Sequence, residues 1–284
     1  MKRELVSALR EAYPVRKVCE VLDLPRSSYY WQGQEKAGDQ ELIEAIEQVI
    51  MRWPYYGYRR ITQQLKRKGY AVGETRVRRL LRELEHSCQV GKVRIRTTDS
   101  RHNHRRYPNR IKQLEITHIN QIWVADITYI RLGRKFIYLA VILDAYSRGV
   151  RGWHLGYSLE KNLTITALKQ ALQEHPAPEI HHSDQGGQYA SPDYIELLPA
   201  STQVSMSAVG TPTENGIVER FMRTFKEEHI DYTEYEDFND AVRQIANWLE
   251  VEYMTERIHS SLDYLTPAEF EIQETYPNPL LLVA

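Results

Sequence analysis

The spacing of apolar residues changes near residue 120, and this change constrains the fold more than any other feature of the chain. Upstream, apolar residues recur at the i, i+3, i+4, i+7 intervals of a helix, most clearly over 77–84. Downstream, turn sequences separate three short apolar runs, at 122–130, 136–143 and 150–155. Such runs are typical of an antiparallel meander. The chain therefore predicts a helical N-terminal part followed by a sheet domain.

The predicted sheet domain continues with alternating helices and strands. Ile165, Leu168 and Leu172 mark one helix on the 3.6-residue period. The other expected elements are short strands at 179–183 and 203–207, a short helix at 192–198, and long helices at about 213–229 and 237–254. Three antiparallel strands followed by alternating elements predict a mixed α/β sheet with helices on both faces.

Charge divides the chain into a basic arm and an acidic body. The formal net charge is only −1, but residues 1–113 hold 25 Lys and Arg against 13 Asp and Glu, whereas residues 114–284 hold 12 against 25. A basic arm of this kind favours contact with nucleic-acid phosphates, and the alternative is a basic surface that is only solvated. The carboxylates of the acidic body are either solvated or engaged in chemistry.

Two small helical modules are predicted in the basic arm, at 1–38 and 39–88. Both are compatible with helix-turn-helix DNA binding, although any small helical bundle gives the same pattern. In the second module, one helix has an apolar face and an opposite cationic face that carries Arg76, Arg79 and Arg82. This face favours contact with DNA, and a solvated arginine face is the alternative.

Residues 89–119 are expected to form a basic linker, which either follows a DNA backbone or becomes ordered only when DNA binds. His102 and His104 lack paired cysteines and are interpreted as linker residues. Cys19 and Cys88 lie far apart, so the sequence supports neither a disulfide framework nor a cysteine zinc site. No apolar run reaches transmembrane length, and we expect a protein of the reducing cytoplasm.

Two aspartates lie at positions of the predicted sheet where the fold alone gives no reason for a carboxylate. Asp126 lies in the middle of the strand W-V-A-D-I-T-Y, where a carboxylate is unfavourable unless it is paired, hydrogen-bonded or bound to a metal. Asp184 directly follows the strand E-I-H-H-S, at the carboxyl end where α/β sheets place their sites. The alternative for Asp184 is a turn aspartate that caps the next segment.

A third carboxylate, Glu219, lies on the helix predicted to begin near residue 213. Arg223 and Lys226 follow it on the same face, so an ordinary i, i+4 salt bridge is one interpretation. The other is that the three carboxylates converge at one edge of the sheet, where their repulsion requires cations. Oxygen ligands suit Mg²⁺ or Mn²⁺, and two such ions promote phosphodiester cleavage. Arg223 and Lys226 then face DNA phosphates.

Six motifs of the sheet domain, in this order and spacing, resemble one known family. They are W-V-A-D-I-T-Y-I (123–130), L-D-A-Y-S-R (143–148), H-S-D-Q-G-G-Q-Y-A-S (182–191), S-M-S (205–207), N-G-I-V-E-R-F (215–221) and R-I-H-S-S-L-D-Y-L-T-P-A-E-F (257–270). The chain resembles the OrfB product of the IS-three family of bacterial insertion-sequence transposases. Upstream, Y-G-Y-R-R-I (56–61) is similar to the family's helix-turn-helix-like module, so we count Arg59 and Arg60 among the expected DNA contacts.

The resemblance implies that residues 120–284 form a catalytic core with the RNase H-like fold of retroviral integrases, on a mixed five-stranded sheet. Matched motif by motif, it implies that Asp126, Asp184 and Glu219 are the catalytic and metal-binding triad and that Lys226 contacts DNA. The positions of the carboxylates in the predicted strands and helix indicate the same three residues.

Three departures from the family pattern lie near Glu219 and the C-terminal motif. The 34 residues between Asp184 and Glu219 (185–218) are one fewer than is usual. Met254 stands where Asn is common, and T-P-T-E-N-G replaces the usual N-x-x-D-N-A. None of the three removes an expected metal ligand, so the predicted reaction is unchanged.

The sequence thus predicts a DDE-type DNA transposase, a polynucleotidyl transferase that cuts and joins DNA strands at insertion-sequence ends with two Mg²⁺ or Mn²⁺ ions. Its expected partners are double-stranded DNA of the transposon ends and target, an OrfA product that is separate or fused, and further copies of the chain on DNA. No membrane partner is expected, and the expected location is the bacterial cytoplasm beside the nucleoid. Two alternatives stay open, a metal-dependent nuclease of the same fold and a DNA-binding regulator.

Overall fold

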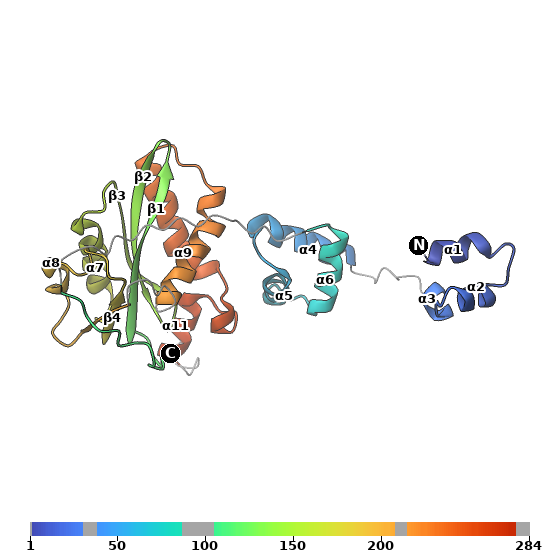
Figure 1. Cartoon of the computed structure of the whole chain (residues 1–284), viewed down its shortest axis with the longest axis horizontal. Helices are drawn as coiled ribbons and strands as arrows, with labels where there is room; N and C mark the ends of the chain where they lie inside the picture. The colour runs from blue at the N-terminus through green and yellow to red at the C-terminus, as the bar shows by residue number, and fades with distance from the viewer. Residues whose placement is uncertain (1, 31–38, 87–104, 208–214, 277–284) are drawn as a thin grey trace, which may run out of the picture. The chain divides into compact units, whose positions relative to one another are not determined.

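The computed structural model describes residues 2–30, 39–86, 105–207 and 215–276 (Figure 1). It contains two compact units, Met1–Gln48 and Val49–Ala284. The boundary between them falls within the helix α4 (Asp39–Arg52). Cys88 and the two histidines of the expected linker, His102 and His104, lie outside the described residues. So do four basic residues of that linker: Lys92, Arg94, Arg96 and Arg101.

Three short helices precede α4: α1 (Lys2–Leu9), α2 (Val15–Val21) and α3 (Arg26–Tyr30). Pro14 stands at the N-cap of α2, a position where its missing N–H has no cost. Val6, Val18 and Cys19 form the buried cluster of these helices. The helical structure predicted for this N-terminal segment is therefore present.

The second unit begins with the end of α4 and continues with α5 (Tyr58–Arg67) and α6 (Glu74–Glu83), which pack on one another. Their packed faces are apolar, because Ile61, Leu65 and Leu80 are fully buried. Gly69, with φ of 89°, makes the left-handed turn after α5 that a side chain would disfavour. The apolar face predicted for α6 is thus confirmed.

A five-stranded sheet forms the centre of the second unit, in the order β3-β2-β1-β4-β5. The strands are β1 (Ile122–Leu132), β2 (Lys135–Asp144), β3 (Val150–Gly156), β4 (Ile180–Ser183) and β5 (Gln203–Met206). The first three are antiparallel, whereas β4 runs parallel to β1 and to β5. The mixed five-stranded sheet predicted from the sequence is therefore confirmed, with β1 at its centre.

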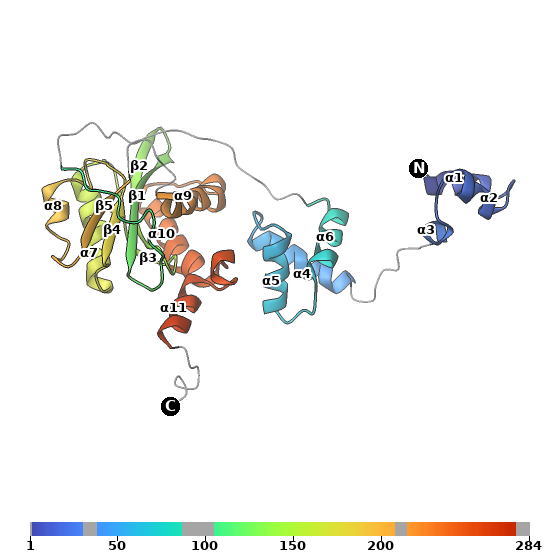
Figure 2. The same ribbon diagram turned by 60° about the horizontal axis from the view of Figure 1, so that its bottom comes forward.

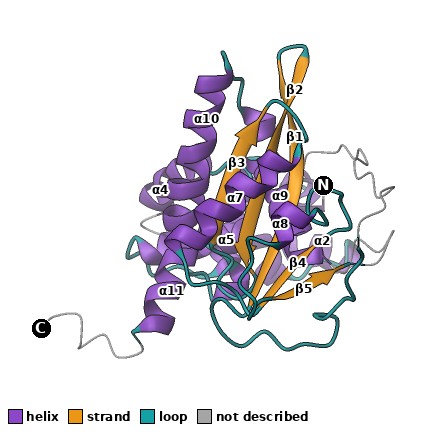
Figure 3. Ribbon diagram, turned by 90° about the vertical axis from the view of Figure 1, so that its left-hand side faces the viewer, coloured by secondary structure: helices purple, strands orange, loops and turns teal. Residues whose placement is uncertain are grey.

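Helices cover both faces of this sheet (Figures 1, 2 and 3). On one face lie α7 (Lys161–Glu174) and α8 (Pro192–Ile195), and on the other lie α9 (Gly216–Glu228) and α10 (Phe238–Ala246). The chain continues through η2 (Ile230–Tyr232), η3 (Asn247–Glu256), η4 (Ser260–Leu262) and α11 (Pro267–Thr275). In the described parts of the chain, no helix has both the length and the apolar character needed to cross a membrane.

Side chains of β1 alternate between the two faces, as a strand requires. Trp123 and Ala125 belong to the hydrophobic cluster beneath α7, whereas Ile122 and Val124 belong to the cluster beneath α9 and α10. Asp126 has the parity of Ile122 and Val124. Its carboxylate therefore points to the face of the sheet that α9 covers.

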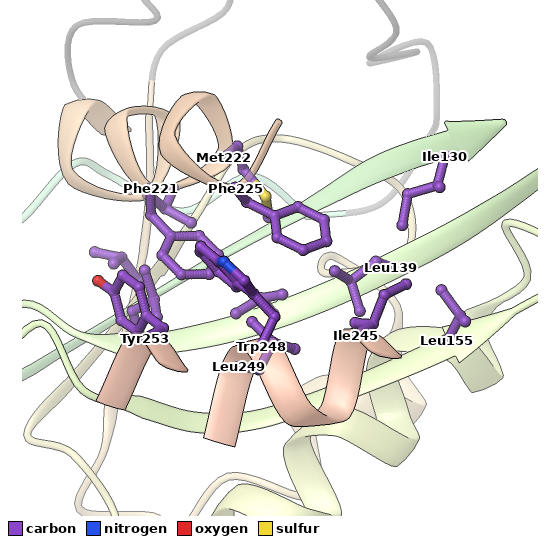
Figure 4. Close-up of a cluster of buried hydrophobic side chains, with 14 of the residues drawn as sticks. Ile130, Leu139, Leu155, Phe221, Met222, Phe225, Ile245, Trp248, Leu249 and Tyr253 are labelled. Carbon is purple, nitrogen blue, oxygen red and sulfur yellow. The ribbon is translucent and has the colours of Figure 1, made fainter. Parts of the chain in front are cut away.

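The long helix expected at about 237–254 is present as α10 followed directly by η3, and η3 is a π-helix. The wider π turn places residues five apart on one face, which brings Trp248 and Tyr253 to the core together. Their rings pack against α9, with centroids 5.0 Å apart for Phe225 and Trp248 and 4.9 Å apart for Phe221 and Tyr253 (Figure 4). An α-helical period does not align these two rings.

The buried Asp144 of the motif L-D-A-Y-S-R shows how this fold accommodates a structural carboxylate. Its two oxygens accept hydrogen bonds from the backbone N–H groups of Asn120 (2.6 Å), Tyr146 (2.9 Å) and Ser147 (2.8 Å). Backbone donors of this kind offset the loss of hydration and fix the turn between β2 and β3. The motif therefore has a structural explanation.

We predict that acid destabilises the fold through its buried histidines. Burial lowers the pKa of His181 from 6.5 to about 3 in the folded chain. As the pH falls below 6.5, His181 takes up a proton in the unfolded chain but stays neutral in the folded chain. The free energy of unfolding therefore decreases by about 2 kcal/mol for this group between pH 7.5 and 5. Urea titrations at several pH values measure this. His181→Gln should reduce the dependence of the free energy of unfolding on pH in this range.

Candidate active site

The parallel pairing of β1 with β4 brings two of the expected site residues together. The register pairs Val124 with His182 and Ala125 with Ser183. The next position in that register is occupied by Asp126 on β1 and Asp184 directly after β4. The two aspartates are thus neighbours at the carboxyl end of β4, where a parallel sheet opens toward a ligand.

Asp126 is held in an environment that disfavours its charge. Burial, together with the nearby charges of Asp184 and Glu219, raises the pKa of Asp126 to about 8. The backbone N–H of Ile127, which donates to its Oδ1 at 2.8 Å, and the amine of Lys226 oppose this rise. Asp144 receives three backbone donors at its turn, and Asp126 receives this one. Asp126 is therefore less fully compensated by hydrogen bonds than Asp144.

The turn after β4 orients Asp184. Its Oδ1 accepts a hydrogen bond from the N–H of Gly186 at 2.9 Å, which closes a tight turn over D-Q-G. The hydroxyl of Ser183 donates to the carbonyl of Asp184 at 2.9 Å. A β-carbon on Gly186 would lie 3.0 Å from Oδ1 of Asp184, so glycine is needed at this close approach. Asp184 therefore forms a turn, as its alternative interpretation proposed. It also lies next to Asp126.

Helix α9 carries Glu219 in its first turn. Asn215, directly before the helix, donates from Nδ2 to the carbonyl of Ala125 in a long hydrogen bond of 3.4 Å, and so ties the start of α9 to β1 beside Asp126. Val218, Phe221, Met222 and Phe225 are buried against the sheet. Glu219 is exposed. It therefore lies within electrostatic reach of Asp126 without being enclosed by the core.

Lys226 and Arg223 lie farther along the same helix. The amine of Lys226 is 4.5 Å from the ring centroid of Tyr129 on β1, a cation–π contact. Burial lowers the pKa of Lys226, and Asp126 opposes that effect. Arg223 is exposed. Tyr129, which sequence reasoning missed, thus fixes the Lys226 amine near the carboxylates.

The donor set of this site fits a divalent cation of the Mg²⁺ type. Its side-chain donors are carboxylate oxygens, which such hard cations prefer. In the described parts of the chain, no three His, Cys, Asp or Glu side chains lie close enough to form a completed metal site. Because the charges of Asp184 and Glu219 raise the pKa of Asp126, a cation among the three carboxylates would relieve repulsion.

A second Tyr that sequence reasoning missed lies beneath the aspartates. Tyr189 is buried, and its hydroxyl has no hydrogen-bond partner within the described residues. Burial and the nearby Tyr194, Asp126 and Asp184 raise its pKa well above the usual value. The sequence shows Tyr189 in the motif H-S-D-Q-G-G-Q-Y-A-S, but it does not predict which way the side chain points.

The cations expected on α5 and α6 fall into two environments. Arg59 and Arg78 are exposed, and their guanidinium carbons lie 5.2 Å and 4.8 Å from the ring centroid of Tyr58. Arg82 is also exposed, whereas Arg76 and Arg79 are half-buried and Arg79 pairs with Glu83 at 2.8 Å. Arg78 was missed because it precedes Arg79 by one residue and falls outside the predicted stripe. The helices α5 and α6 thus present an exposed cationic patch around Tyr58.

Arg60, also expected to contact DNA, makes a contact inside the second unit. Its Nη1 lies 3.2 Å from Oε1 of Glu228 at the end of α9, and its side chain is 21% exposed. Adjacent arginines in Y-G-Y-R-R-I therefore have different surroundings. Sequence adjacency gave no means of separating them.

Protein-family comparisons agree with this geometry. Two models described as "Integrase core domain" match residues 116–212 and 200–267, and one described as "HTH-like domain" matches residues 37–93. The protein is therefore an integrase-core enzyme, a DDE polynucleotidyl transferase preceded by a helix-turn-helix-like region.

Curated relatives give the family. The chain is 35% identical to the insertion element IS600 uncharacterized 31 kDa protein of Shigella sonnei, over 89% of this chain and 97% of that protein. It is 34% identical to the transposase for insertion sequence element IS904 of Lactococcus lactis, over 76% and 87%. It is also 29% identical to the transposase InsF of IS3A in Escherichia coli, over 95% and 98%. The chain belongs to the IS3 family of transposases, which cleave DNA and transfer strands.

Solved structures similar to the chain include two integrase cores. One is the HTLV-2 integrase catalytic core domain in complex with magnesium, in its trimeric form, at 20% identity over 53% of this chain and 95% of that chain, with a TM-score of 0.39. The other is the catalytic core domain of BIV integrase, at 18% identity over 56% and 97%, with a TM-score of 0.43.

We predict that Gly186→Ala lowers DNA cleavage while the fold persists. The new β-carbon would lie 3.0 Å from Oδ1 of Asp184 and 3.2 Å from Oε1 of Gln188, and it would displace the carboxylate. A displacement of this size should reduce the cleavage rate by at least about tenfold. Gly216→Ala on α9, where no atom of the described residues lies within 4 Å of the added β-carbon, is the matched control. Equal rates for the two variants would contradict the expected role of the turn.

Proposed function

We propose that Asp126, Asp184 and Glu219 hold two Mg²⁺ ions, or Mn²⁺ in their place, and that the chain cuts and joins DNA at the ends of an insertion sequence with them. The observation that carries this proposal is the β1–β4 register, which leads to adjacent aspartates at one sheet edge. The raised pKa of Asp126, caused by burial and then by Asp184 and Glu219, supports a shared cation site.

The chain's own groups position DNA and charge. Asp126 and Asp184 form a rigid pair because one lies on a central strand and the other is held by the N–H of Gly186. Glu219 approaches from the exposed face of α9, where DNA has access. When bound, the two ions activate a water or a DNA 3′-hydroxyl and stabilise the leaving oxygen.

Two reactions follow from one site. Water first attacks a phosphodiester and releases a DNA 3′-hydroxyl. That hydroxyl oxygen then forms a bond to the phosphorus of a second strand, and the 3′-oxygen of the cleaved target bond departs. No protein–DNA bond forms, so the protein mainly orients the reacting strands.

Lys226 and Arg223 are proposed to hold DNA phosphates beside the carboxylates. Both lie on α9 with Glu219, and the ring of Tyr129 keeps the Lys226 amine near Asp126. A second DNA contact is proposed for the patch around Tyr58, made by Arg59, Arg78 and Arg82, which are exposed. Arg76 and Arg79 remain proposed contacts of the same helix.

The remaining proposals concern partners and organisation. We propose four segments: helices at 1–38, a helix-turn-helix-like module at 39–88, a basic linker at 89–119 and the catalytic core at 120–284. The chain acts on double-stranded DNA of the transposon ends and target, with an OrfA product and further copies of itself. It acts beside the nucleoid in the bacterial cytoplasm, where that DNA lies.

We predict that Asp126→Asn, Asp184→Asn and Glu219→Gln each abolish Mg²⁺-dependent cleavage and joining of labelled end DNA. Loss of a direct ligand should lower the rate by at least about 100-fold, since even outer-shell partners of a metal contribute up to that factor. Asp193→Asn, at an exposed aspartate paired with Lys161 on the α7 and α8 face, should leave the rate unchanged.

This assay also distinguishes the rival functions. Cleavage without a joined product indicates a nuclease, and DNA binding without chemistry indicates a regulator. If the chain alone is inactive, the same assay on a fusion with OrfA decides between a missing partner and a regulatory role. Activity that survives all three substitutions would falsify the proposed metal site.

We predict that Lys226→Gln weakens DNA binding and its salt dependence together. Loss of one phosphate contact should lower the slope of log affinity against log salt by about 0.9. Fluorescence anisotropy with end DNA at 50–300 mM salt, about the range where such contacts dominate, measures this slope. Lys169→Gln, an exposed lysine on α7, is the control and should not change it. An unchanged slope for Lys226→Gln would exclude a phosphate contact.

A further inference from the structure

A buried ion-pair cluster lies at the end of α9 farthest from Glu219. Nε and Nη2 of Arg257 lie 2.6 Å from the two carboxylate oxygens of Glu228, a bidentate pair. Only 5% of the Arg257 side chain and 7% of the Glu228 side chain are exposed. Nη1 of Arg257 also lies 3.2 Å from Nε2 of His259. The motif R-I-H-S-S-L therefore supplies Arg257, which binds the last residue of α9. The proposed metal site gives this motif no role.

Arg60 completes this cluster from the other side. Its Nη1 lies 3.2 Å from Oε1 of Glu228, and its guanidinium carbon lies 5.1 Å from the ring centroid of Tyr56. Burial and the neighbouring Arg257 lower the pKa of Arg60, while Glu228 opposes them. We call Arg60, Glu228 and Arg257 the Glu228 cluster. Two guanidinium groups thus share one buried carboxylate.

Further contacts join the same stretch of chain to the C-terminal helices. Arg52 pairs with Glu256 at 2.6 Å, and Arg67 pairs with Glu269 on α11. The rings of Tyr55 and Tyr232 lie 6.3 Å apart. The exposed ion pairs contribute little individually, but they surround a buried one. Residues 49–284 form one compact unit, which is consistent with this set of contacts.

Helix α9 connects the Glu228 cluster to the carboxylate site. Glu219 and Glu228 are nine residues apart on one 13-residue helix, a separation of about 14 Å along its axis. The apolar face of the helix is fixed by Phe221 and Phe225 against the core. Holding the last turn of α9 therefore limits its tilt and rotation, and so sets the position of Glu219.

We propose that Arg60 and Glu228 are positioning residues for the strand-transfer reaction, and that Y-G-Y-R-R-I docks α5 on the end of the helix that carries Glu219. This inference rests on the proposed role of Glu219. It assigns Arg60 to the core and leaves the neighbouring Arg59, which is exposed beside Tyr58, to DNA. The two arginines of this motif are thus assigned different roles.

The adjacent arginines provide a matched pair of variants, Arg60→Gln and Arg59→Gln, in the full-length chain. The first readout is amide hydrogen exchange of α9 in the absence of DNA and metal. Arg60→Gln should speed exchange in the last turn of α9 by about tenfold, because the end of the helix loses a buried partner. Arg59→Gln should leave this exchange unchanged.

The second readout is the salt dependence of DNA binding, and the third is the rate of Mg²⁺-dependent joining at saturating DNA. Arg59→Gln should lower the salt slope by about 0.9. Arg60→Gln should leave the slope unchanged and lower the joining rate by about tenfold, because Glu219 is less well held. Arg60→Lys, which retains the charge, should recover part of both the exchange protection and the joining rate.

Two results overturn the proposal: unchanged α9 exchange in Arg60→Gln, or a salt slope that falls as it does in Arg59→Gln. If Arg60→Gln does not fold, Arg60→Lys and Arg59→Lys form a milder pair for the exchange comparison alone, because both keep the charge on which the salt slope depends. Exchange is measured without DNA or metal, so it tests the docking separately from the chemistry. If the two variants differ in α9 exchange as expected but the unsubstituted chain joins no DNA, the result contradicts the proposed function and leaves the docking intact.

Discussion

The parallel hydrogen bonding between β1 and β4 is the constraint on which the rest of the site depends. It is a short ladder, since β4 has only four residues, yet it decides which side chain stands beside Asp126. A shift of one residue would replace Asp184 by Ser183 at that position and turn alternate side chains to the opposite face. The buried His181 and Tyr194, joined by a 2.7 Å hydrogen bond beneath α8, help to hold the ladder in register.

The sequence contained most of the fold and the main candidates for the site. Strand and helix periods predicted the meander, the alternating elements and the helices α5 and α6, because those patterns reflect burial of one face at a time. Asp126 stood out because a carboxylate in the middle of an apolar strand requires a partner. The resemblance to a known family then selected the same triad, and the comparisons confirm that family.

What the sequence did not predict depends on contacts between distant segments. Arg59 and Arg60 are chemically identical neighbours, and only the position of Glu228 separates them. Tyr129 and Tyr189 look like ordinary core aromatics until the strand directions are known. The π-helical turns of η3 arise because Trp248 and Tyr253 both pack against α9, a tertiary demand that overrides the local helical period.

The order of these segments along the chain has a consequence for synthesis. A ribosome makes Y-G-Y-R-R-I first, the strand of Asp126 next, and Glu228 and Arg257 only near the end. Arg60 is therefore made long before its ion-pair partner Glu228, and the last turn of α9 can take its final position only after Arg257 has also been made. A chain that ends before Arg257 holds all three carboxylates of the site but lacks the buried ion pair at the last turn of α9. Packing of the helix that carries Glu219 thus depends on a residue made 38 positions later, Arg257.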